Sequence, residues 1–150
     1  MSHSFVSLVS HIIFSTKNRR PMLRAEIRDE LHAYTGGVLR SENCCLLKAG
    51  GISDHIHILA QLNASLPVAT CVQKIKTNTS RWLKRRFPTH SKFAWQEGYA
   101  AFSVSPSQIP KVKAYIENQQ EHHRKRSFTE ELRDLLRAHK VEFDERDLPG

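Results

Sequence analysis

Several features that the sequence lacks narrow the classes of protein to which it can belong. No apolar run approaches the roughly 20 residues that a membrane-spanning helix needs, and the apolar stretch 5–14 is interrupted by His11 and by serines. Positive charges follow that stretch, which is the reverse of a secretion signal. We therefore expect a protein without a membrane segment.

Cysteine is scarce as well. Cys44, Cys45 and Cys71 are odd in number and lack Cys-x-x-Cys spacing, so they predict neither a disulfide framework nor a zinc site. We interpret them as small core residues of a reduced, cytoplasmic protein.

Acidic residues are few relative to basic ones. Lysine and arginine outnumber aspartate and glutamate by 23 to 15, which gives a net charge of +8 and an isoelectric point near 9.7. This balance favours a polyanionic partner, either a nucleic acid or an anionic membrane surface. Each basic cluster alone is also typical of a solvated helix or loop face. The predicted DNA contacts are Lys17, Arg19, Arg20, Lys74, Arg81, Lys84, Arg85, Lys111 and Arg124.

Candidates for stacking on unpaired bases are Phe93, Trp95 and Tyr99, although Trp95 suits the core equally well.

The most informative stretch is GGISDHIHILAQ at residues 50–61. Its second half alternates, with His55 and His57 on one face and isoleucines on the other, which is the period of a half-buried strand. We expect the isoleucines to enter a core and both imidazoles to leave from the solvent-facing side. The glycines at 50–51 and the polar pair at 53–54 predict the preceding turn. The two imidazoles could hold one metal ion, or they could be exposed histidines without a ligand.

The remaining patterns predict an α+β fold. They indicate strands at 6–15, 43–49 and 99–104 and a helix at 22–40. They also indicate a second helix that has Ser65 as its N-cap and Pro67 in its first turn, and that runs to about residue 87. With the histidine strand, the order is β-α-β-β-α-β, the ferredoxin-like pattern of an antiparallel sheet with both helices on one face. The open face of such a sheet is a common nucleic-acid platform, and here it would carry the histidine pair.

Two further helices are expected after this core. The core takes up about residues 1–104 of a single domain, 1–150, and a breaker at 105–107 ends it. Helices are predicted at about 108–126 and about 129–140, the second beginning with a capping box.

The first of these helices carries Tyr115 and Gln119, which are four residues apart and therefore share a face. Such a pair is also typical of the edge of a packing face. The functional interpretation makes Tyr115 a nucleophile and Gln119 an oxygen ligand beside the histidines. Two imidazoles and an amide oxygen, without a thiolate, suit Mg²⁺ or Mn²⁺ better than structural zinc.

The metal would assist the tyrosine, whose hydroxyl has an ordinary pKa of about 10 and attacks poorly at neutral pH. A divalent cation can polarise a phosphate and stabilise the charge that develops on its oxygens. Attack on a DNA phosphodiester would leave a phosphotyrosine and a free 3′-hydroxyl, so the strand could be rejoined without ATP. The absence of a Walker phosphate-binding loop from the sequence agrees with this.

Four motifs resemble those of the single-tyrosine transposases of the HUH superfamily, the small IS200-like insertion-sequence enzymes that move DNA as single strands. The motifs are HIIFSTKNRRP at 11–21, DHIH at 54–57, WQEGY at 95–99, and KAYIENQ at 113–119 followed by two histidines at 122–123. A His-hydrophobic-His pair alone is weak evidence. Its combination with Tyr-x-x-x-Gln in a helix after the fourth strand is specific.

The resemblance implies an enzyme that cleaves and rejoins single-stranded DNA. It assigns metal binding to His55, His57 and Gln119, and it assigns to Tyr115 the attack that gives a 5′-phosphotyrosine. It also implies a homodimer that recognises hairpins near the element ends, with the tyrosine helix of one subunit serving the histidines of the other.

Some questions stay open at this point. The resemblance gives no role to His11, Asn118, His122 or His123. Two alternatives remain for the function: a non-catalytic module that binds single-stranded or hairpin nucleic acid, and a related HUH replication initiator with the same metal site.

Overall fold

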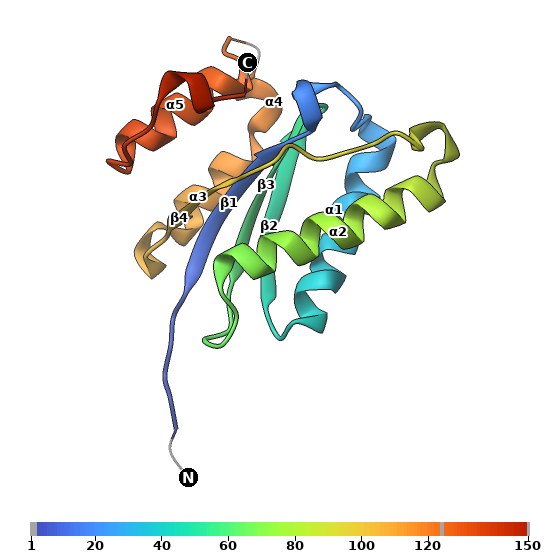
Figure 1. The fold of residues 1–150 in the computed structure, drawn as a ribbon. Coiled ribbons are helices and arrows are strands. Elements are labelled where there is room, and N and C mark those ends of the chain that lie inside the picture. The colour runs from blue at the N-terminus through green and yellow to red at the C-terminus, as the bar shows by residue number, and fades with distance from the viewer. Residues whose placement is uncertain (1–2, 124, 150) are drawn as a thin grey trace.

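The computed structural model describes residues 3–123 and 125–149. The strands in this part of the chain are β1 (Val9–Ser15), β2 (Cys45–Ile52), β3 (His55–Gln61) and β4 (Ala100–Ser103). They form an antiparallel sheet in the order β2-β3-β1-β4. Helices α1 (Ala25–Ser41) and α2 (Val68–Arg86) lie together on one face of this sheet (Figure 1). The predicted α+β, ferredoxin-like fold is therefore confirmed.

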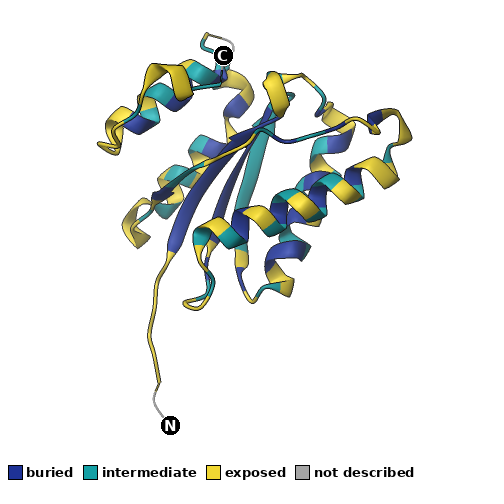
Figure 2. Cartoon of the chain, in the orientation of Figure 1, coloured by how far each residue is buried: buried dark blue, intermediate teal, exposed yellow. Residues whose placement is uncertain are grey.

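The main core lies between the sheet and these two helices. Ile12 and Phe14 of β1 and Ile56 and Ile58 of β3 point into it and are at most 1% exposed, as the alternation in each strand predicts. The helices contribute apolar side chains at helical spacing: Ile27, Leu31 and Leu39 from α1, and Val72, Ile75 and Leu83 from α2. Fully burying one such side chain contributes about 1.5–3 kcal/mol. Figure 2 shows that β1 and β3 are buried, that β2 is intermediate, and that α1 and α2 each have exposed residues along the outer side.

The other face of the sheet, which we expected to be open, is covered by the C-terminal part of the chain. Helices α3 (Ile109–Glu117), α4 (Gln119–His122) and α5 (Phe128–Ala138) lie on that side (Figure 1). Ile116 of α3 packs against Val9 and Leu59. A separate cluster joins α5 to the sheet: Phe128, Leu132 and Leu136 with Ile13 and Phe102. The prediction of an open platform is therefore wrong.

The helix predicted at 108–126 is not continuous. It is interrupted at Asn118, where ψ is 28° and the backbone N–H bonds to the carbonyls of both Ala114 and Tyr115. Asparagine is a poor helix former, so a break here is physically inexpensive. The terminal helix is α5, and its predicted capping box is present between Ser127 and Glu130.

Other predictions can be compared with the structure residue by residue. The three cysteines are free, and Cys44 and Cys71 are buried as expected, but Cys45 is exposed. Phe93 and Trp95 are also buried, 1% and 8% exposed, so both are core residues and cannot stack on DNA bases. None of the helices in the described ranges combines the length and apolarity needed to cross a membrane.

The glycine pair of the histidine hairpin has a different role from the one predicted. Gly50 and Gly51 belong to β2 and pair with β3, and the turn itself consists of Ser53 and Asp54. A Cβ atom at Gly50 would lie 2.5 Å from the carbonyl oxygen of Ile116 and 2.7 Å from its Cγ2 atom. Because Ile116 follows Tyr115 in α3, the missing side chain sets how closely the tyrosine helix approaches β2.

Substitution of Gly50 should therefore disturb the packing of α3. We expect Gly50→Ala to lower the free energy of unfolding by about 1–3 kcal/mol, the usual cost of inserting a methyl group into a filled space. The matched control is Gly37→Ala within α1, where an added Cβ meets no atom within 4 Å. That change should stabilise the protein by about 0.5–1 kcal/mol. Urea unfolding measures both, and equal stability of the two variants would contradict the packing argument.

Candidate functional site

The two predicted histidines lie in a buried polar cluster. Both point away from the main core, as the alternation predicts, but His55 is 1% and His57 0% exposed because α3, α4 and α5 cover them. The ring of Phe128 at the start of α5 lies 4.6 Å from that of His55, between ring centroids. The expectation that these imidazoles face solvent is wrong, since it assumed an uncovered sheet.

Glu131 of α5 lies at the centre of this cluster and is 0% exposed. Its Oε1 atom is 3.1 Å from Nε2 of His57, 3.0 Å from Nε2 of His123 and 3.4 Å from Nε2 of His55. One carboxylate oxygen therefore contacts three imidazoles, two from β3 and one from the residue that follows α4.

The other oxygen of Glu131 contacts the predicted nucleophile. Oε2 accepts a hydrogen bond from the Tyr115 hydroxyl, and a second from Nε2 of Gln119 at 3.1 Å. The amide oxygen of Gln119 lies 3.0 Å from Nε2 of His55. The structure thus brings together the four site residues predicted from sequence, His55, His57, Tyr115 and Gln119, around a carboxylate that was not predicted.

The negative charge of Glu131 and the positive charge of His55 stabilise each other. Burial alone would raise the pKa of Glu131, but hydrogen bonds from His123, His55 and His57 outweigh it and hold the pKa far below its usual range. Burial would likewise lower the pKa of His55, but bonds to Asp54 and Glu131 raise it to about 9. Nδ1 of His55 is 2.8 Å from Asp54 Oδ1. Since its neighbours on both sides are acceptors, His55 donates from both ring nitrogens.

His57 is instead neutral, because burial lowers its pKa to about 4 against the opposing effect of Glu131. An ionised carboxylate can only accept, so Nε2 of His57 donates to Glu131 and its Nδ1 accepts. The donor to Nδ1 is Nε2 of His11, 2.8 Å away. Burial and the neighbouring His57 lower the pKa of His11 to about 3, so it too is neutral. His11 therefore fixes the ring orientation of His57.

Tyr115 is held in its protonated form. Burial, followed by the charge and the hydrogen bond of Glu131, raises its pKa well above its usual value, although Arg126 acts in the opposite direction. Nη2 of Arg126 donates to the Tyr115 oxygen at 3.1 Å. The ring of His122 stacks on that of Tyr115 at 4.5 Å, and its buried Nε2 has no hydrogen-bond partner among the described residues.

The cluster has the composition of a metal site. Ligand atoms of His55, His57 and Glu131 all lie within 4.8 Å of one another, and all three residues are buried. The amide oxygen of Gln119 is next to them. Imidazole nitrogens with carboxylate and amide oxygens are suitable ligands for a divalent cation. These residues could therefore bind a metal ion.

The predicted DNA contacts are distributed over several surfaces. Lys17 and Arg20 line a hollow of about 280 Å³ together with Lys92, which the sequence had not singled out. Arg81, Lys84 and Arg85 are exposed near the end of α2, whereas Lys74 pairs with Glu42 at 3.2 Å. Lys111 is exposed on α3 and Arg19 is half-buried after β1. Arg124 lies outside the described residues.

Sequence reasoning missed Glu131, gave no specific role to His11, and did not place Arg126 beside Tyr115. A signal for Glu131 was present, because residue 131 is three positions after Phe128 and one before Leu132, within the apolar stripe of α5. An acid in such a stripe is unexpected unless it is paired. His11 and Arg126 gave no comparable signal, because their roles depend on contacts between distant segments.

Comparisons with known proteins identify the family to which the chain is similar. A family model described as "Transposase IS200 like" matches residues 4–119. Two curated transposases for insertion sequence element IS200, from Salmonella typhimurium and Salmonella typhi, are each 25% identical over 126 residues, which covers 81% of this chain and 82% of theirs.

Two solved structures share the fold. One is a candidate transposase from Deinococcus radiodurans R1, with a TM-score of 0.65, 23% identity, and coverage of 79% of this chain and 96% of that one. The other is a REP-associated tyrosine transposase bound to a REP hairpin, with a TM-score of 0.61, 13% identity, and coverage of 82% and 73%. By its class the protein is a transposase, and the chain belongs to the IS200-like transposase family. Membership implies an enzyme that processes DNA.

The raised pKa of His55 predicts a pH dependence of stability. Between the ordinary value of 6.5 and about 9, the folded protein binds the proton of His55 and the unfolded chain releases it. This contribution to stability is fully present below pH 6.5 and is lost as the pH rises through 9. The difference in free energy of unfolding between the wild type and His55→Gln should therefore decrease from pH 6.5 to 9, in urea titrations with chelator. His3→Gln, at an exposed position, is the matched control, and a constant difference for His55→Gln would contradict the assignment.

Proposed function

We propose that the protein cleaves and rejoins single-stranded DNA at the ends of an insertion sequence, with Tyr115 as the nucleophile. The observation that carries this proposal is the hydrogen-bonded connection from the Tyr115 hydroxyl through Glu131 to His55 and His57. A module that only binds nucleic acid needs no tyrosine hydroxyl beside two histidines. The family match supports the same class of reaction.

The proposed reaction is a transfer of the phosphodiester to the protein. The Tyr115 oxygen forms a bond to phosphorus, and the bond from phosphorus to the 3′ oxygen of the preceding nucleotide breaks. The tyrosine gives up its proton as the bond to phosphorus forms, and the departing 3′ oxygen takes up one proton as it becomes a hydroxyl, so that the net change is the movement of one proton from the tyrosine to the leaving group. Arg126, whose guanidinium donates to the tyrosine oxygen, stabilises negative charge there. Rejoining is the reverse of this step.

A divalent cation, Mg²⁺ or Mn²⁺, would be held by His55, His57 and Gln119, and each imidazole nitrogen that binds it would give up its proton. The cation would stabilise the charge that develops on the phosphate oxygens. Glu131 supplies a further oxygen next to the same atoms. His11 keeps the His57 ring in place through its bond to Nδ1, the kind of outer contact that orients a ligating imidazole.

The proposed substrate carries hairpins near the element ends. One relative of the same fold is described as bound to a REP hairpin. The hollow formed by Lys17, Arg20 and Lys92 has no acidic residue among its lining residues, so it is suited to a DNA phosphate. The exposed basic residues of α2 and α3 would contact further phosphates.

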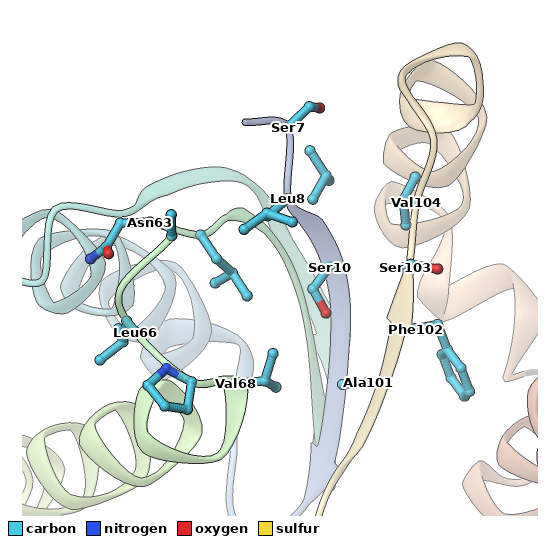
Figure 3. Close-up of a pocket in the computed structure, with 14 residues that line it drawn as sticks. Ser7, Leu8, Ser10, Asn63, Leu66, Val68, Ala101, Phe102, Ser103 and Val104 are labelled. Carbon is cyan, nitrogen blue, oxygen red and sulfur yellow. The ribbon is translucent and has the colours of Figure 1, made fainter. Parts of the chain in front are cut away.

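We also propose a homodimer. Strand β4 is one of the two edge strands of the sheet and is only 4 residues long, and a short edge strand can pair with its own copy across a two-fold axis. An apolar cavity of about 440 Å³ lies beside it, lined by Leu8, Val68 and Ala101 among others (Figure 3). In this chain Tyr115 lies over its own histidines, and an exchange of tyrosine helices would rebuild the same contacts between two subunits.

The nucleophile can be tested by removing a single oxygen atom. Tyr115→Phe should form no covalent adduct with single-stranded DNA from the element end, because the attacking atom is absent, while hairpin affinity stays nearly unchanged. The matched control is Tyr34→Phe on α1, which should cleave as the wild type does. Adducts are measured by denaturing gel electrophoresis with labelled DNA, and chelation of divalent cations should abolish them. A wild type that binds hairpins without forming any adduct would instead indicate the non-catalytic module.

The proposed exchange of tyrosine helices can be tested by mixing two inactive variants. Tyr115→Phe protein and a His55→Ala, His57→Ala double variant are allowed to exchange subunits. If the helices are exchanged, one site in each heterodimer regains the tyrosine and both histidines, so we expect part of the cleavage to return. Continued inactivity, with heterodimers shown to be present, would place all the groups of a site in one subunit and leave the role of Tyr115 unaffected.

A further inference from the structure

A cavity of about 600 Å³ adjoins Tyr115 on the side of His11. Its lining residues come from β1, from the end of β4 and the segment after it, from α3 and from α5. The histidines of β3 and Glu131 are almost completely buried, so this cavity gives access to Tyr115 from the surface. We name it the Tyr115 pocket. Its volume is within the range of about 300–1,000 Å³ that is typical of sites for small organic ligands.

The composition of the Tyr115 pocket suits a nucleoside attached to phosphates. Val104, Val112 and Leu135 supply apolar walls, and Gln108 and Ser105 supply groups that can hydrogen-bond to a base edge. The ring of His139 is fixed by stacking on Phe102, with centroids 4.2 Å apart and planes inclined by 12°. A planar base can stack on such ring and apolar surfaces.

The charge of the pocket points to an anionic ligand. Lys111 lines it and makes no ion pair with any described residue, and no acidic residue is among the residues that line it. The hollow beside Gly50 differs, because Asp29 and Glu117 line it. The apolar cavity of Figure 3 differs as well, because no charged residue lines it. Of these three, only the Tyr115 pocket combines apolar walls with a cation and no acid.

The proposed chemistry decides which nucleoside can occupy this position. In phosphoryl transfer the attacking and leaving oxygens are roughly in line on opposite sides of phosphorus. The 3′ oxygen of the preceding nucleotide must therefore point away from Tyr115. The following nucleoside is attached to the same phosphorus through its 5′ oxygen, so it branches to the side and stays attached to the phosphotyrosine. A pocket lined by Tyr115 itself is suited to that second nucleoside.

We propose that the Tyr115 pocket binds the unpaired nucleoside immediately 3′ of the scissile phosphate, with its base against the apolar walls and His139 and a neighbouring phosphate at Lys111. This inference rests on the proposed function, and it adds a binding site for a particular part of the substrate. Three of the lining residues, Leu135, Ala138 and His139, lie beyond the segment matched by the family model. The base preference at this position would therefore differ between relatives with different terminal helices.

The test uses a single-stranded oligonucleotide that spans the cleavage position, after that position has been mapped by sequencing the DNA end joined to wild-type Tyr115. Two further oligonucleotides lack one base each, immediately 3′ or immediately 5′ of the break. The initial rate of adduct formation is measured below saturation. We expect loss of the 3′ base to lower the rate by roughly 10- to 100-fold, the effect of losing one stacked base, and loss of the 5′ base to have a smaller effect.

The second part of the test uses a variant whose larger side chain fills the Tyr115 pocket. Ala138→Trp, at an exposed residue on the rim of the pocket, should lower the rate on the intact strand to a similar extent. It should add little to the loss already caused by removing the 3′ base, since both changes remove the same contact. Ala33→Trp, exposed on α1 on the opposite side of the sheet, is the matched control and should react as the wild type does.

The outcomes separate this inference from the proposed function. If wild-type protein forms adducts through Tyr115 but neither the 3′ base nor Ala138→Trp affects the rate, the pocket assignment is wrong and the proposed function stands. Greater sensitivity to the 5′ base would also overturn it. If the wild type forms no adduct that depends on Tyr115, the proposed function fails and this inference fails with it.

Discussion

The buried carboxylate of Glu131 is the constraint on which the arrangement of the site depends. An ionised group without solvent contact costs several kcal/mol unless opposite charge and hydrogen bonds surround it. Here those partners come from β3, from α3 and α4, and from the segment that joins α4 to α5. Each of these elements must therefore be in place before the charge is satisfied. The result is a site whose geometry is fixed by the same contacts that attach the C-terminal helices to the sheet.

Helix α5 consequently has three roles: it covers the sheet, it supplies the buried carboxylate, and it lines the Tyr115 pocket. It covers the second face of the sheet through Phe128, Leu132 and Leu136. It brings Glu131 to the histidines, and it forms one wall of the Tyr115 pocket through Leu135 and Ala138. The segment matched by the family model ends at Gln119, before this helix begins. The histidines, the tyrosine and the amide thus lie within the segment that the family model matches, and the carboxylate lies beyond that segment.

Much of the fold could be predicted from the sequence, because periodicity reports which side of an element is apolar. The alternation around His55 and His57 correctly placed the isoleucines in the main core, and the capping box located the start of α5 within one residue. Periodicity does not report whether the polar side of a strand or helix is exposed to solvent. The face that carries the histidines looked exposed in sequence, yet a second apolar layer covers it, and that layer contributes the unpredicted Glu131. The position of Gly50 within β2 was missed for a similar reason, since a glycine pair followed by a polar pair is compatible with either a turn or a close approach between elements.

Gly50 also has a consequence for the accuracy of strand pairing. It lies opposite His57 in the ladder, and directly opposed residues project on the same face of a sheet. A slip of one residue between β2 and β3 would move side chains to the wrong face. The smallest slip that keeps each side chain on its face is two residues, and it would bring Lys48 or Ile52 into the place of Gly50. Either side chain would occupy the space that Ile116 needs. Helix α3 can therefore pack against the sheet only when β2 and β3 are paired in the register that puts glycine opposite His57.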